Sequence, residues 1–195
     1  RDPQELGNPR STLDGAPVTF RDTEHFFIDL AKIEPALRTW LDSTDRSYWR
    51  TNTLMFTQNW LREGLRGRAI TRDLEWGVPV PGNDPAFKDK RIYVWFDAVI
   101  GYYSASLEWA KRTNQPDAWH QWWDPSADQK GYYFIGKDNI PFHTVIFPST
   151  LLGSGKKWTM LHHMSSTEYL NYESGKFSKS NGIGVFGNDA VESGI

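Results

Sequence analysis

Apolar residues recur every three or four positions in two stretches of the first third of the chain. In residues 25–43 this spacing predicts an amphipathic helix, which we expect Pro35 to interrupt because proline has no N–H to donate within a helix. A second helix is predicted within residues 52–71, ending at Gly64 or Gly67. The apolar positions are Phe26, Phe27, Leu30, Ile33, Leu37 and Leu41 in the first helix and Leu54, Phe56, Trp60, Leu61 and Leu65 in the second. Residues 1–20 are rich in Pro, Gly, Asn and Asp and are predicted to be irregular.

After residue 90 the pattern changes to short apolar runs that alternate with helical stretches. Runs rich in β-branched and aromatic residues at 91–98, 130–138 and 157–165 have the length of strands, and helical spacing fills 99–113 and 139–153 between them. This order indicates right-handed crossovers and therefore a parallel sheet with flanking helices, an α/β fold. Ligands of such sheets bind beyond the carboxyl ends of the strands, where the sequences WFDA and GKDN lie.

Polar side chains follow the second predicted strand. Gly136 permits a ligand to approach the backbone closely, and Asp138 can accept hydrogen bonds from a ribose diol. Asn139, His143 and Phe147 recur every four residues and so share one face of the next helix. Together these residues predict a binding wall; the alternative is that Asp138 or Asn139 only caps the helix.

The first predicted strand leads into a second group of candidate residues. Trp95 and Tyr102 flank the small Ala98, so that one ring can form a floor and the other a side wall that carries a hydroxyl. A pocket of Trp, Tyr, His and Phe rings suits a slender, polarizable guest such as a thioether. The alternative is that Trp95 packs into the core and Tyr102 lies on the helix surface.

The sequence GKFSKS at 175–180 places two lysines and two serines around one phenylalanine. Lys176 and Lys179, with the hydroxyls of Ser178 and Ser180, can wrap a polyphosphate; the alternative is an ordinary solvated turn. The NGIGVFG sequence that follows matches G-x-G-x-x-G, but a dinucleotide fingerprint needs a strand before it and an acidic residue about 20 positions later. We therefore predict a flexible loop there.

Composition narrows the classes of function. The net charge of −2 argues against a purely electrostatic nucleic-acid binder, so contact with RNA needs local patches. One candidate patch, alternatively a solvated basic face, comprises Arg62, Arg66, Arg68 and Arg72. The absence of cysteine excludes disulfides and a thiolate zinc site within this chain and fits a reducing, cytoplasmic compartment. The adjacent His162 and His163 should face opposite sides of a strand, so we expect no metal site, and no apolar run is long enough to predict a membrane span.

Taken in order, these motifs resemble those of the methionyl-tRNA synthetase family of class I aminoacyl-tRNA synthetases. Lys176-Phe177-Ser178-Lys179-Ser180 is similar to the Lys-Met-Ser-Lys-Ser signature of the class, with Phe in place of Met. The sequences RAITRDLEWGVPVP, YVWFDAVIGY, FIGKDNIPFH and TEYLNYESGKFSKS are similar to segments of the family. KDNIPFH, KFSKS and GVFG look more like its eukaryotic cytosolic branch. The resemblance runs from about residue 20 to the end of the chain.

The resemblance implies an ATP-dependent ligase that joins methionine to tRNA(Met) through a methionyl-adenylate, with Mg²⁺ accompanying ATP. It implies the second half of a Rossmann-like nucleotide-binding fold at 70–165, preceded at 1–69 by the C-terminal part of an inserted connective domain and followed at 166–195 by the signature loop and its flanks. The methionine-binding residues that it implies are Trp95, Ala98, Tyr102, Asn139, His143 and Phe147. The ATP-binding residues are Gly136, Asp138, Lys176, Ser178, Lys179 and Ser180, with Lys176 and Lys179 as catalytic groups that stabilise charge on the triphosphate.

Departures from the family pattern limit what the chain is expected to do alone. The family's other nucleotide motif, His-Ile-Gly-His, and the cysteines of its zinc knuckles do not occur here. We therefore expect a fragment that lacks the N-terminal half of the catalytic domain, is inactive by itself, and has that half or a synthetase complex as its partner. Val99 and Phe147 stand where bacterial relatives have Pro and Trp, which leaves the outline of the pocket open.

Two other functions compete with this reading. One is another class I synthetase for an apolar amino acid, which is disfavoured because a branched aliphatic guest would leave ring surface unfilled. The other is a non-catalytic module that binds RNA or glycans through its 10 tryptophans.

Overall fold

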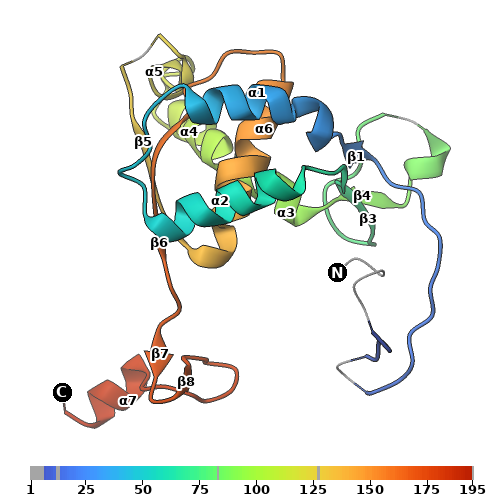
Figure 1. Cartoon of the computed structure of the whole chain (residues 1–195), viewed down its shortest axis with the longest axis vertical. Helices are drawn as coiled ribbons and strands as arrows, with labels where there is room; N and C mark the ends of the chain where they lie inside the picture. Colours follow the sequence, from blue (N-terminus) through green and yellow to red (C-terminus); the bar gives the residue numbers. More distant parts are fainter. Residues whose placement is uncertain (1–6, 12–13, 83, 127, 195) are drawn as a thin grey trace.

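The computed structural model of the chain describes residues 7–11, 14–82, 84–126 and 128–194. The helices α1 to α6 and their strands form a body, from which the N- and C-terminal segments extend in the same direction (Figure 1). The described part of residues 1–20 forms turns, bends and an isolated bridge between Arg10 and Pro17, as its composition predicts. Among the described residues, no helix is both long and apolar enough to cross a membrane.

The first helix, α1 (Leu30–Asp42), continues through Pro35, so the predicted interruption is wrong. It begins at Asp29, whose carboxylate accepts a hydrogen bond from the backbone N–H of Lys32 at 3.1 Å. Pro35 is tolerated because it and Ala31, four residues earlier, both lie on the exposed side of the helix. Water can therefore reach the Ala31 carbonyl, which loses its partner within the helix.

The second helix, α2 (Thr51–Glu63), ends at Gly64 as predicted, where the backbone takes a φ of 79° that favours glycine. The apolar stripe predicted for it is wrong at Phe56, which is 40% exposed. Two threonines take part in the buried face instead. The Thr53 hydroxyl lies 2.8 Å from the hydroxyl of Ser166 on β6, and the Thr57 hydroxyl donates to that of Thr144 at 2.8 Å. Paired hydroxyls remove the cost of burying polar atoms, so threonine can serve as a core residue here.

Two short antiparallel pairs precede the central part of the chain. β1 (Phe27–Ile28) pairs with β2 (Arg68–Ala69), and β3 (Thr71–Asp73) pairs with β4 (Lys90–Ile92). The helix η2 (Pro85–Phe87) lies in the loop between β3 and β4.

The strand predicted at 91–98 is wrong beyond Ile92. The chain turns at Tyr93, whose carbonyl accepts hydrogen bonds from two following backbone N–H groups, and enters a continuous helical stretch. This stretch consists of α3 (Val94–Asp97), η3 (Ala98–Ile100) and α4 (Gly101–Arg112). The aromatic run has strand propensity, but packing of its rings on helical spacing overrides that preference.

The predicted parallel sheet is present as one pair of strands. β5 (Gly131–Gly136) runs parallel to β6 (Leu161–Thr167), so the α/β fold class is confirmed, with two parallel strands rather than three among the described residues. The crossover between them is helical and comprises η4 (Lys137–Asn139), η5 (Phe142–Ile146) and α6 (Phe147–Gly153). The short helix α5 (His120–Trp123) precedes β5.

The crossover helix contains one wide turn. η5 is a π-helix, in which the N–H of Phe147 donates to the carbonyl of Phe142, five residues earlier. Pro148 follows this wide turn and lies in the first turn of α6. A missing N–H costs no helical hydrogen bond at that position.

The core joins the two parts of the chain that the domain prediction separates at residue 69. Leu37 of α1 and Leu61 of α2 pack in one cluster with Val145 and Ile146 of η5. A second cluster joins Trp49 to β6, and a third packs Val99 and Trp123 on α6. The boundaries 1–69, 70–165 and 166–195 remain predictions.

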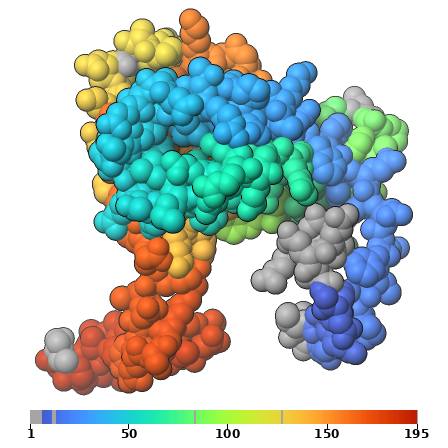
Figure 2. Space-filling model, in the orientation of Figure 1, coloured from blue at the N-terminus to red at the C-terminus, as the bar shows by residue number. Residues whose placement is uncertain are grey.

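The last part of the chain forms an arm that projects from the body (Figure 2, orange to red). It contains the hairpin of β7 (Asn171–Tyr172) and β8 (Gly175–Lys176), followed by α7 (Gly187–Glu192). The flexible loop predicted at NGIGVFG is in part a turn, closed by backbone hydrogen bonds in both directions between Ser178 and Ile183.

The expectation that His162 and His163 face opposite sides of their strand is wrong. The register of β5 and β6 shifts between Gly131 and Tyr132, so β6 carries one extra residue at this point. Both imidazole rings consequently lie beside Tyr48, at centroid distances of 5.5 and 5.4 Å. The described residues contain no cluster of three side chains suited to hold a metal ion.

Candidate active site

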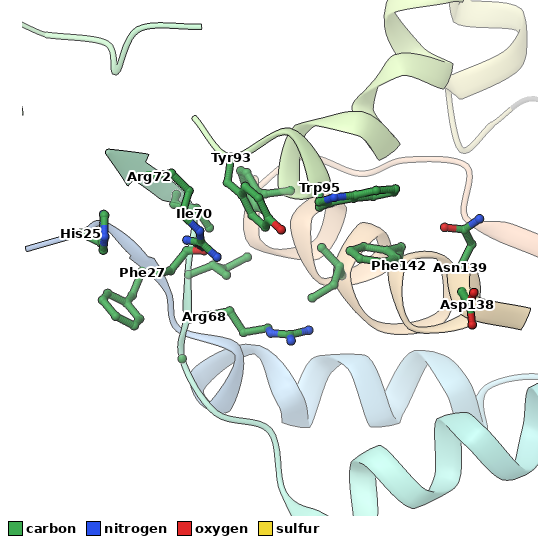
Figure 3. A pocket seen from close by; sticks show the side chains of 15 residues that line it. His25, Phe27, Arg68, Ile70, Arg72, Tyr93, Trp95, Asp138, Asn139 and Phe142 are labelled. Carbon is green, nitrogen blue, oxygen red and sulfur yellow. Dashed lines mark hydrogen bonds between the residues drawn. The ribbon is translucent and has the colours of Figure 1, made fainter. Parts of the chain in front are cut away.

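A cavity of about 930 Å³ extends from the β1–β2 pair to the turn after β5 (Figure 3). Four segments line it, and they lie within 25–28, 67–72, 93–96 and 138–146. Arginine side chains line the cavity from the second segment, and the carboxylate of Asp138 lies in the fourth. The cavity thus offers both signs of charge beside aromatic rings, which suits an amphipathic or zwitterionic ligand.

Asp138 and Asn139 reach this cavity from the turn after β5, as the sequence predicts. Among the described residues, no side chain caps the helical turns that begin here. The alternative that Asp138 or Asn139 only caps the helix is therefore wrong. Gly136 precedes them, and no described atom lies within 4 Å of the place that a Cβ would occupy there. A ligand can therefore approach this backbone closely.

Trp95 forms an aromatic wall of the same cavity. Its ring stacks on Phe142 at a centroid distance of 5.6 Å and remains 49% exposed (Figure 3). The alternative that Trp95 packs into the core is therefore wrong. Phe142 was not predicted as a site residue, although it lies three positions after Asn139 and so near the same helix face.

Tyr102 and His143 form a hydrogen-bonded pair. The Tyr102 hydroxyl lies 2.7 Å from Nε2 of His143, and Nδ1 of the same ring lies 2.8 Å from the carbonyl oxygen of Asn139. A carbonyl oxygen only accepts, so Nδ1 carries the proton and Nε2 accepts from the hydroxyl. Burial lowers the pKa of His143, while the hydrogen bond to Asn139 opposes this shift. The pair therefore presents a neutral imidazole at neutral pH.

The remaining predicted pocket residues gather around this pair. Phe147 is buried, with its ring centroid 6.1 Å from that of Tyr102. Ala98 is exposed on the helical stretch that carries Trp95 and Tyr102. Tyr102 also lines a second cavity of about 400 Å³ with Tyr133, whose pKa is raised to about 12 by burial and by the nearby Tyr102. The structure thus brings Tyr102, His143 and Phe147 together, and Trp95 and Asn139 line the large cavity.

The candidate phosphate-binding residues lie on the arm. Lys176 places its ammonium group 3.6 Å from the ring centroid of Tyr169, and the hydroxyls of Ser178 and Ser180 lie 3.3 Å apart. Lys179 is exposed in the turn that follows β8. Lys176 and Lys179 are not among the described residues that line the large cavity.

The basic patch is divided by the structure. Arg68 and Arg72 line the cavity, whereas the exposed Arg62 donates to Asn59 within α2. The guanidinium of Arg72 donates to the carbonyl oxygens of Ala69 and Thr71 and lies 3.9 Å from the ring centroid of Tyr93. The cation is therefore held in place at the cavity rather than free in solvent.

Comparison with known proteins decides the family. The sequence model described as "tRNA synthetases class I (M)" matches residues 1–195. The chain belongs to this family. The resemblance drawn from the sequence motifs is thereby confirmed.

Several ligases of the class I (M) family are close relatives of the chain. A methionine–tRNA ligase of Roseiflexus castenholzii (strain DSM 13941 / HLO8) is 70% identical over 183 residues, which cover 92% of this chain and 31% of that protein. The cytoplasmic methionine–tRNA ligase of Saccharomyces cerevisiae is 49% identical over 195 residues, which cover all of this chain and 25% of that protein. The chain thus spans less than a third of the length of these relatives.

Solved structures of the class I (M) family share the fold. The Mycobacterium tuberculosis methionyl-tRNA synthetase in complex with methionyl-adenylate matches with a TM-score of 0.65 at 22% identity, over 95% of this chain and 34% of that one. This likeness supports the partial Rossmann-like α/β fold.

Proposed function

We propose that this chain is a segment of a methionine–tRNA ligase. In the first reaction the carboxylate of methionine attacks the α-phosphate of ATP, which gives methionyl-adenylate and pyrophosphate. In the second reaction a hydroxyl of the 3′ adenosine of tRNA(Met) attacks the carbonyl carbon of methionyl-adenylate, which forms an ester with the methionyl group and releases AMP. The observation that carries the proposal is the position of Asp138 and Asn139, which both line the large cavity. The carbonyl of Asn139 also orients the imidazole of His143, which forms an aromatic cluster with Tyr102 and Phe147.

The aromatic cluster is the proposed methionine site. A thioether is polarizable and packs favourably on ring edges and faces. The rings come from two helical stretches, and the neutral Tyr102–His143 pair supplies a polar group without a charge to desolvate. The proposed methionine-binding residues are Trp95, Ala98, Tyr102, Asn139, His143 and Phe147.

The turn after β5 and the arm are the proposed ATP site. Asp138 accepts from the ribose, and the absence of a side chain at Gly136 lets the nucleotide lie against the backbone. Lys176 and Lys179, with the hydroxyls of Ser178 and Ser180, act on the triphosphate. Mg²⁺ enters with ATP as part of the substrate. Because adenylate formation needs little covalent chemistry from the protein, positioned cations supply much of the transition-state stabilisation.

The proposed setting is the cytoplasm. Relatives in Saccharomyces cerevisiae and Schizosaccharomyces pombe are named as cytoplasmic ligases, and the chain has no cysteine that an oxidising compartment would pair. The remainder of the catalytic domain and tRNA(Met) are the proposed partners.

The test compares the chain alone with the chain in a complete enzyme. A chimeric ligase, in which this chain replaces the homologous segment of the Roseiflexus castenholzii protein, should catalyse methionine-dependent exchange of pyrophosphate into ATP. The isolated chain should not, because the His-Ile-Gly-His motif is absent from it. A folded chimeric ligase without exchange activity would contradict the proposed function. Exchange by the isolated chain would contradict the expectation that the chain is inactive by itself.

A further inference from the structure

Tyr169 connects the candidate ribose-binding residue to the arm. Its hydroxyl donates a hydrogen bond to Oδ2 of Asp138, and two ammonium groups lie over its ring. Lys176 lies 3.6 Å from the ring centroid and Lys137 lies 4.4 Å from it. One side chain thus contacts both the carboxylate at the end of β5 and the first lysine of the signature sequence.

The residues next to Tyr169 are fixed to the body of the protein. Glu168 accepts hydrogen bonds from Lys137 at 2.6 Å and from Asn52 of α2 at 3.1 Å. Asn52 accepts in turn from the buried Ser166 of β6 at 2.7 Å. The position of Tyr169 is therefore set by the end of the sheet, whereas Lys176 belongs to the hairpin that lies farther out.

The Tyr169 hydroxyl makes the contact that a ribose hydroxyl would make. Both groups are O–H donors, and in the proposed function both use the carboxylate of Asp138. The hydrogen bond to Asp138 and the negative charge of that carboxylate raise the pKa of Tyr169, so the phenol remains a donor at neutral pH.

We propose that Tyr169 is a positioning residue that holds the signature hairpin (β7 and β8, which carry Lys176) beside the ribose site and is exchanged for the ribose when ATP binds. This inference rests on the proposed function, because it takes Asp138 as the ribose contact. The hydroxyl and the ring have separate parts. The hydroxyl competes with the nucleotide for Asp138, and the ring keeps the ammonium group of Lys176 near that site through a cation–π contact.

The two parts predict opposite effects for two substitutions in the chimeric ligase. Tyr169→Phe keeps the ring and removes the competing hydroxyl, so KM for ATP should fall by about fivefold, the size of one net hydrogen bond. Tyr169→Leu removes the ring, so kcat for pyrophosphate exchange should fall by about fivefold or more because Lys176 loses its position. Tyr172→Phe removes a hydroxyl from the hairpin that carries Lys176 and is the matched control. It should leave KM for ATP and kcat unchanged.

Nucleotide analogues separate competition for the carboxylate from a general change in structure. With 2′,3′-dideoxy-ATP the ribose offers no hydroxyl to Asp138, so Tyr169→Phe should leave its KM unchanged while lowering KM for ATP. A fall for both nucleotides, or for neither, would overturn the exchange. Equal kcat in the Tyr169→Leu and parent enzymes would overturn the role of the ring.

Failure of the proposed ribose contact gives a different result. Asp138→Asn should raise KM for ATP and leave KM for the dideoxy analogue unchanged. If it changes neither, Asp138 does not bind the ribose and the proposed function is wrong at this residue. If Asp138→Asn behaves as expected but Tyr169→Phe does not, only the exchange is overturned.

Discussion

Removal of the Tyr102 hydroxyl tests the assignment of the His143 tautomer. In Tyr102→Phe the Nε2 atom of the buried His143 loses its donor, which the structure places at 2.7 Å. A buried acceptor left without a partner costs about 1–3 kcal/mol. Tyr102 is 40% exposed, so water can reach part of this site, and we expect a loss near 1 kcal/mol.

Urea unfolding of the chain measures this loss, with Tyr103→Phe as its control. The ring of Tyr103 packs edge-on against Trp119 and Trp123, and its hydroxyl makes no hydrogen bond within the described part of the chain. The control should therefore lose less than about 0.5 kcal/mol. In addition, the hydroxyl stabilises the neutral imidazole, so the pKa of His143, followed by ¹⁵N NMR, should rise in Tyr102→Phe. Equal stability of the two variants with an unchanged His143 titration would refute the assignment.

Three further predictions concern Lys179 in the signature sequence, Gly184 in the turn that follows it, and the buried His143. In the chimeric ligase, Lys179→Ala should lower the rate of adenylate formation about 100-fold or more. Its affinity for methionine, measured by equilibrium dialysis, should stay nearly constant. Weak methionine binding with a normal rate of adenylate formation would contradict this role. Gly184→Ala should destabilise the turn by about 1–3 kcal/mol, because φ is 136° and the added Cβ would overlap the ring of Phe177; unchanged amide hydrogen exchange in the turn would exclude this strain. The lowered pKa of His143 means that the unfolded chain binds more protons below the ordinary value of 6.5, so stability should fall as pH is lowered through this range, by at most about 1.4 kcal/mol per pH unit for this group. His143→Gln should reduce that slope in urea titrations between about pH 5 and 7, and an unchanged slope would show that another group is responsible.

The elements predicted best were those in which the apolar pattern agreed with the conformational preferences of the residues themselves. α2 ends at Gly64, where a positive φ is needed, and β5 and β6 follow runs of strand-forming residues separated by a full crossover helix. The end of β5 was also found, because Gly136 and Asp138 interrupt the apolar run where a parallel strand meets a ligand.

The errors arose where distant contacts outweigh local preference. The aromatic run after Ile92 reads as a strand, but its rings pack from a helix, and Trp95 stacks on Phe142 from another element. On the buried face of α2, Leu61 was predicted, but Thr57 was missed because it finds a hydroxyl partner 87 residues away. A pattern of apolar positions carries no information on such a partner.

Tyr169 was missed for a related reason. It lies on no periodic face, two residues beyond the end of β6, and its significance depends on Asp138 and Lys176 meeting it in space. The signal that the sequence offered is a tyrosine between the end of a strand and the GKFSKS sequence.

The wide turn in the crossover helix constrains how this region can change in evolution. The turn holds one residue more than a regular helix would, and Pro148 lies directly after it, in the first turn of α6. Deletion of a residue from Phe142–Ile146 would restore a regular helix but place the proline in its interior. A shorter turn is therefore harmful unless Pro148 is replaced as well.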